Sequence, residues 1–238
     1  MTNEIFYQDP YAKSCKAIVA AIELKGQNAV AEFTSTVCYP IGGGQPSDEA
    51  TITGPSGMLN VKQVQRRGYS ILHQGKLLGE LRVGDEVEIA IKWSHRHHCM
   101  RLHTAGHLLH DALQEIADFP LVPVKGHHGK KAYLEYAGTG PIKIERLQGQ
   151  IDGLISRNLP VRMSEATLDA IKEACAFVPP GLPSNKPLRI VQIGDHSPVP
   201  CGGVHVKSLD EIGQLIVQAA VEDSPGAWKL KYRISAAQ

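Results

Sequence analysis

The sequence lacks the features that mark membrane and secreted proteins. No apolar run reaches the roughly 18 residues that a membrane-spanning helix needs, so no membrane association is expected. The first residues lack a basic segment followed by an apolar stretch, so no secretory signal is expected. The five cysteines form no CxxC pair and no paired framework. This pattern favours a reduced, cytoplasmic setting, and nothing in the chain points to an obligate protein partner.

The chain also lacks an excess of positive charge. Its 25 Lys and Arg residues face 24 Asp and Glu residues, for a net charge of +1. Proteins that hold long stretches of nucleic acid by the phosphates usually show a larger basic excess. Any nucleic acid partner is therefore expected to be held locally or by its shape.

The residues that are present predict an α+β protein with two domains. With 42% hydrophobic and 21% charged residues, a chain of 238 residues can build an ordinary globular core. Short runs of strand-forming residues separated by turn signals predict a small β-barrel over residues 1–92, with strands at 29–33, 50–53 and 86–91. Residues 93–238 mix helices and strands, which predicts an α+β domain with an antiparallel sheet.

The strongest helical pattern covers residues 94–117, where apolar residues repeat along one face and Ser94 offers an N-cap. Further helices are expected at 142–157 and at 164–175. Strands are expected on both sides of a Gly/His turn within 122–136, and at 159–163, 188–193, 212–221 and 228–235.

Two pairs of residues carry the chemistry. His103 and His107 are four apart in the long helix, so both imidazoles lie on one face, a geometry that suits two ligands of one Zn²⁺. Cys201 and His205 are also four apart, but the intervening glycines predict a loop that can bend both side chains toward one ion. Together they form a Cys1His3 set that suits one zinc ion per chain. Taken singly, the His103 and His107 pair is also compatible with ordinary surface or core residues, Cys201 with a buried structural thiol, and His205 with a surface histidine.

Two familiar motifs are missing from these segments. A zincin protease carries Glu after its first His, whereas this chain has Thr104. The glycine-rich stretch of residues 42–48 has neither the Lys-Ser/Thr of a Walker loop nor the spacing of a dinucleotide fingerprint. Its three successive glycines permit close approach of a ligand or of another backbone segment, and are also compatible with a flexible hairpin loop.

The paired HxxxH and CxxxH segments resemble the signature of the alanyl-tRNA synthetase editing domain. The stretch Gly-Gly-Gly-Gln-Pro-Ser-Asp at 42–48 resembles the glycine-rich motif of that domain, and the resemblance runs from Phe33 to the end. The chain is most similar to the freestanding AlaX trans-editing proteins that keep the N-terminal barrel. The resemblance implies hydrolysis of mischarged tRNA(Ala), chiefly Ser-tRNA(Ala) and also Gly-tRNA(Ala), held by its acceptor end.

The resemblance also implies roles for residues around the zinc ligands, one of which, His205, is expected to give way to water or substrate. Gln45, Asp48 and Thr104 are expected to act in catalysis. The residues expected to bind the substrate are Gly43, Gly44, Lys125, His127 and His128. Structural roles remain open for some of these residues. Thr104 could simply form a hydrogen bond to the backbone of its own helix, and His127 and His128 could form a solvent-exposed turn. Asp195 and His196 are candidates to support a ligand.

Two other functions remain open from the sequence. The chain could be a tRNA-binding module with a structural zinc and no catalysis, or a zinc hydrolase of small esters on the same fold. A closed metal site without hydrolysis would indicate the first, and equal rates on a free aminoacyl ester would indicate the second.

Overall fold

The computed structural model describes residues 2–235, which form two compact units. One unit comprises the chain up to Gly42 together with Pro46–His98, and the other comprises Gly43–Gln45 together with Cys99 onward. The three residues of the glycine-rich stretch that follow Gly42 therefore belong with the second unit, although the chain on both sides of them belongs with the first.

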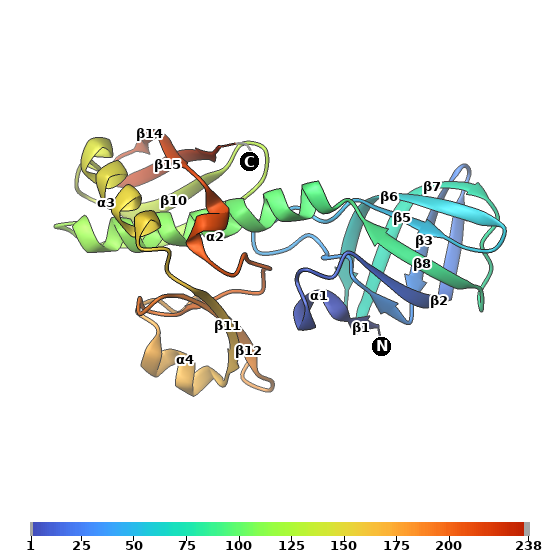
Figure 1. Cartoon of the computed structure of the whole chain (residues 1–238). Coiled ribbons are helices and arrows are strands. Elements are labelled where there is room, and N and C mark those ends of the chain that lie inside the picture. Colours follow the sequence, from blue (N-terminus) through green and yellow to red (C-terminus); the bar gives the residue numbers. More distant parts are fainter. Residues whose placement is uncertain (1, 236–238) are drawn as a thin grey trace. The chain divides into compact units, whose positions relative to one another are not determined.

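The first unit is the predicted barrel, which is closed in the order β2-β3-β7-β6-β5-β8 (Figure 1). Alternation in β8 turns Val87, Ile89 and Ile91 into the core, where they are at most 8% exposed. The barrel strands are β2 (Ser14–Lys25), β3 (Asn28–Phe33), β5 (Ala50–Thr53), β6 (Gly57–Arg67), β7 (Ser70–Gly79) and β8 (Glu86–Ile91). Before and between them lie β1 (Asn3–Glu4), α1 (Ile5–Gln8) and β4 (Ser35–Thr36).

The three expected barrel strands are confirmed, whereas the long strands β2, β6 and β7 were not predicted. The strands expected at 29–33, 50–53 and 86–91 correspond to β3, β5 and β8 within one residue. The sequence did not predict β2, which pairs with both β3 and β8 and so closes the barrel. Its small residues and mixed polar pattern gave a weak strand signal, and its place depends on partners far along the chain.

The long helix α2 (Trp93–Ile116) begins and ends one residue before the expected limits. Its middle turns are buried, since Met100, Leu108 and Leu109 are fully covered. In the second unit, α2 is linked by hydrogen bonds to the sheet of order β14-β15-β10-β9. The Tyr232 hydroxyl donates to the Leu102 carbonyl at 3.2 Å. The sheet strands are β9 (Leu121–His127), β10 (Tyr133–Gly138), β14 (Leu215–Ser224) and β15 (Ala227–Ile234).

The remaining elements of the second unit include a smaller sheet of order β11-β12-β13. These elements are α3 (Ile144–Ser156), β11 (Val161–Ala166), α4 (Leu168–Ala174), β12 (Leu188–Ile193), β13 (Val199–Pro200) and the 3-10 helix η1 (Leu209–Ile212). The helix expected from 164 begins later, because β11 continues to Ala166 opposite Leu188. Thr167 then caps α4 by accepting from the Ala170 N–H at 3.3 Å.

Across the described residues, α2 and the other helices are too short or too polar to cross a lipid bilayer.

Candidate metal centre

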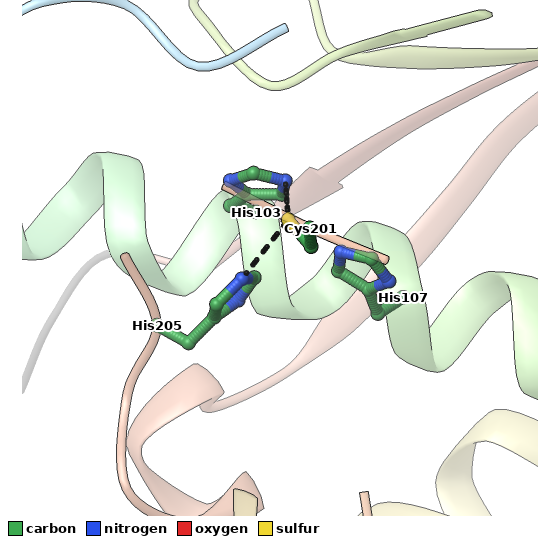
Figure 2. A group of neighbouring side chains, drawn as sticks. All are labelled: His103, His107, Cys201 and His205. Atoms are coloured by element: carbon green, nitrogen blue, oxygen red, sulfur yellow. Dashed lines mark hydrogen bonds between the residues drawn. The ribbon is translucent and has the colours of Figure 1, made fainter. Parts of the chain in front are cut away.

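The predicted ligands come together in one group (Figure 2). His103 and His107 project from adjacent turns of α2, and Cys201 and His205 lie on the loop that follows β13. The ligand atoms of the four side chains all lie within 4.8 Å of one another. The Cys201 Sγ is 3.4 Å from Nε2 of His103 and 3.4 Å from Nε2 of His205. Four donor atoms at this separation form a group that could hold a metal ion.

Gln45 sets the orientation of His103. Its Oε1 accepts from the Val204 N–H at 3.2 Å and lies 2.8 Å from Nδ1 of His103. An amide oxygen carries no proton, so Nδ1 of His103 must donate, which leaves a lone pair on Nε2. That nitrogen is the one that faces Cys201. Gln45 therefore fixes both the ring plane and the tautomer that a metal requires.

Thr104 orients His205 in the same way that Gln45 orients His103. Its Oγ1 is 3.2 Å from Nδ1 of His205 and accepts from the Val206 N–H at 3.3 Å. A neutral His205 that binds a cation through Nε2 carries its proton on Nδ1, where the Thr104 oxygen lies to accept it. Thr104 is fully buried behind His205, so it contacts the ligand rather than the cavity.

The electrostatic setting favours a cation. Burial lowers the pKa of His103 and of His107 well below the ordinary value, and neighbouring imidazoles lower it further. Burial likewise lowers the pKa of His205 to about 3, with His128 adding to the shift. These rings are therefore neutral and present lone pairs. Burial raises the pKa of the Cys201 thiol to about 11, and a divalent cation would reverse this by favouring the thiolate. The oriented nitrogens and the sulfur fit zinc.

His128 stands beside the metal group without belonging to it. Its ring stacks on that of His103, with centroids 4.2 Å apart and planes 18° apart. Nδ1 of His128 lies 2.6 Å from the Tyr232 hydroxyl, whose proton goes to Leu102. His128 Nδ1 therefore donates and Nε2 keeps a lone pair. The His128 backbone N–H donates to the Gly44 carbonyl at 2.8 Å, which ties the glycine-rich stretch to this turn.

A cavity of about 700 Å³ opens beside the metal group. The sequence-predicted residues that line it are Gly43, Gly44, His103, His107, Lys125, His128, His196 and Cys201. A Cβ on Gly44 would overlap the Gly126 backbone, so only glycine permits this wall. His205 is fully buried and does not line the cavity, which argues against its giving way to substrate.

Two predicted residues, Asp48 and His127, lie away from the cavity, and a third, His196, lines it without contacting a ligand. Asp48 is 1% exposed in the first unit, where its carboxylate accepts from Arg96 and from the Tyr39 N–H at 2.6 Å. These contacts fit a structural ion pair rather than a catalytic carboxylate. His127 does not line the cavity, and its ring lies 5.6 Å from that of Tyr133. His196 lines the cavity, but the supporting role considered for it is not seen, since its Nδ1 lies 3.3 Å from Glu115 rather than against a ligand.

Sequence reasoning missed two participants. Tyr232 positions His128 from a strand more than a hundred residues away, and no local pattern marks it. Asp111 lines the cavity one helical turn beyond His107. It could have been found by continuing the four-residue spacing of the histidines along the helix.

Replacing Gln45 by Leu is expected to weaken zinc affinity by about 10- to 100-fold. The change removes the acceptor for Nδ1 of His103 and for the Val204 N–H while keeping the buried volume similar. Competition with a chromophoric chelator measures the affinity. Gln65→Leu, at an exposed position of β6 in the barrel, is the control with the same chemical change. Equal affinities for the two variants would show that Gln45 does not hold His103.

The sequence was compared with known families and proteins. Residues 12–95 match the family described as tRNA synthetases class II (A), and residues 188–229 match the threonyl and alanyl tRNA synthetase second additional domain. Alanyl-tRNA editing protein AlaX-L of Pyrococcus horikoshii is 30% identical over 98% of this chain, which spans 58% of that protein's length. The alanine–tRNA ligase of Pyrobaculum aerophilum is 31% identical over 91% of this chain and 25% of the ligase.

The alanyl-tRNA editing protein AlaX-M of Pyrococcus horikoshii is 32% identical, and the match covers 90% of this chain and 89% of that protein. Unlike the match to the ligase, this one extends over nearly the whole of both chains. The chain belongs to the AlaX family of alanyl-tRNA editing proteins.

Proposed function

We propose that this chain is an aminoacyl-tRNA deacylase that acts in trans on mischarged tRNA(Ala). Ser-tRNA(Ala) is the chief substrate and Gly-tRNA(Ala) the second. The observation that carries the proposal is the group of four donor atoms at the wall of a cavity of about 700 Å³. The names of the relatives, which refer to alanyl-tRNA editing, support the choice of substrate.

One Zn²⁺ per chain is proposed as the cofactor, held by His103, His107, Cys201 and His205. When bound, zinc supplies a Lewis acid that polarises the ester carbonyl and favours deprotonation of a water molecule. Gln45 and Thr104 act as positioning residues, because each contacts a ligand imidazole on the side away from the Cys201 sulfur. This assignment replaces the catalytic roles that the sequence suggested for them.

The cavity wall is proposed to bind the acceptor end of the tRNA. Gly43 and Gly44 allow close approach of the terminal nucleotide, and Lys125 offers a positive charge to its phosphate. His128 offers the hydrogen-bonding capacity of a neutral imidazole held by Tyr232. Hydrolysis adds water across the ester, releasing the free amino acid and restoring the terminal ribose hydroxyl.

Such an enzyme is needed because a synthetase selects poorly between amino acids that differ only slightly in size. A synthetase pocket built for alanine rejects serine or glycine poorly, because one small group is worth only about 1–3 kcal/mol. A second site that binds the serine hydroxyl through a polar group can remove the error after it occurs.

The proposal is tested by deacylation of Ser-tRNA(Ala), Gly-tRNA(Ala) and Ala-tRNA(Ala), side by side, with zinc-loaded and chelator-treated protein. We expect rapid, zinc-dependent loss of serine, slower loss of glycine, and sparing of alanine. Adding zinc back to the stripped protein should restore the rate. Absence of hydrolysis by zinc-replete protein would contradict the proposal and indicate a binding module. Equal hydrolysis of a free seryl ester would indicate a small-ester hydrolase.

A further inference from the structure

The cavity extends along α2 beyond the metal group, and carboxylates line this part of it. Asp111 lies one helical turn past His107, and Glu115 lies one turn further. Glu135, on β10, also lines the cavity. Side chains four apart on a helix share one face, with about 5–6 Å between their Cβ atoms. Asp111 is thus the acidic residue of α2 nearest in sequence to a proposed ligand.

These three carboxylates differ in their partners. Glu135 lies 2.9 Å from the Lys229 ammonium. Glu115 accepts from the Gln150 side chain and lies 3.3 Å from Nδ1 of His196. Asp111 has neither a hydrogen bond nor an ion pair within residues 2–235, although it is only 8% exposed. Asp111 is therefore a buried carboxylate on the cavity wall with its acceptor oxygens available.

A buried carboxylate without partners is costly, and a ligand that supplies N–H donors and positive charge offsets the cost. Burial, together with a smaller effect of the nearby Glu115, raises the pKa of Asp111 to about 7. An anionic or apolar ligand group would leave this cost in place. The Asp111 carboxylate therefore suits a small cation with several hydrogen-bond donors.

We propose that Asp111 binds the α-ammonium group of the aminoacyl ester and makes the site selective for substrates with a free amine. This inference rests on the proposed function, which supplies the substrate. The ammonium is attached to the carbon next to the ester carbonyl, so an ester placed at the metal group has its ammonium within reach of the next turn of α2. The other ionic groups of the acceptor end are phosphates, which a carboxylate repels.

The test compares Ser-tRNA(Ala) with N-acetyl-Ser-tRNA(Ala), which has a neutral amide in place of the ammonium. Wild-type protein is expected to cleave the free-amine substrate with a kcat/KM about 10- to 100-fold higher, as one charge-assisted contact allows. Asp111→Asn has nearly the same shape but no negative charge. Its kcat/KM is expected to fall by about the same 10- to 100-fold on Ser-tRNA(Ala), and not on the acetylated substrate. The preference should then collapse while zinc content and activity on the acetylated substrate are kept.

Glu135→Gln removes a carboxylate from the same cavity wall and tests whether general negative charge accounts for the effect. Its preference for the free amine should match that of wild-type protein. A second readout is binding of a non-hydrolysable seryl-amide analogue of the terminal adenosine, with and without N-acetylation, by calorimetry. Asp111→Asn should bind the two forms equally.

A preference that persists in Asp111→Asn, or that is absent from wild-type protein, would overturn the inference. So would a preference that collapses equally in Glu135→Gln. None of these three results bears on the proposed function, which depends on whether wild-type protein deacylates Ser-tRNA(Ala).

Discussion

Cys201→Ala protein is expected to lose bound zinc and to deacylate Ser-tRNA(Ala) at least about a thousandfold more slowly, since a Lewis acid supplies several kcal/mol to such a reaction. Cys201 is the group member whose ionised form brings negative charge, and its sulfur lies 3.4 Å from Nε2 of two of the imidazoles. Removing it leaves neutral rings that hold a divalent cation weakly. Metal content by mass spectrometry and single-turnover deacylation measure the two losses.

Cys15→Ala is the matched control, because it removes a half-buried thiol from β2 of the barrel. It should keep both zinc and activity. Circular dichroism should show that Cys201→Ala remains folded, since the side chain lies on a loop. Full activity together with full zinc content in Cys201→Ala would rule out the proposed ligand set.

Gly203→Ala is expected to weaken zinc binding and to slow deacylation by about 100-fold or more, as loss of ligand orientation does. A Cβ at Gly203 would overlap Cε1 and Nδ1 of His103 and would lie 3.2 Å from Oε1 of Gln45. The His103 ring also stacks on the ring of His128 and is held by Gln45, so the imidazole has little freedom to move away. The cause is steric, because Gly203 does not have a positive φ.

Gly149→Ala provides the same chemical change where a Cβ meets nothing within 4 Å, in the middle of α3. It should leave zinc affinity unchanged and raise the thermal midpoint slightly, since Ala favours helix over Gly by about 1 kcal/mol. Gly203→Ala with normal zinc affinity would show that the loop moves easily, and that His103 is less tightly held than its contacts indicate.

The sequence predicts those parts of the molecule that are marked by a pattern within a short segment of the chain. Periodic apolar residues identified α2 within one residue at each end. The spacing of His103 and His107, with the glycines between Cys201 and His205, anticipated side chains that do lie together. Where the sequence placed a helix start at residue 164, pairing of β11 with β12 prevailed over local propensity.

The roles of individual residues were harder to predict, because they depend on approaches between distant segments. Gln45 lies 58 positions from His103, and only the folded chain shows that its amide meets the imidazole. Asp48 looked like a catalytic carboxylate because it closes a glycine-rich motif, yet Arg96 from α2 neutralises it. Nothing near Asp48 in the sequence distinguishes a neutralised carboxylate from an available one.

The division of the chain has a consequence for any minimal gene fragment. Gly43–Gln45 group with the second unit although barrel sequence flanks them on both sides. A fragment that begins at Cys99 would carry all four proposed ligands but would lack the amide that orients His103. In such a fragment another group would have to accept the hydrogen bond from Nδ1 of His103. The shortest gene that encodes the whole site therefore includes the glycine-rich stretch as well as the second unit.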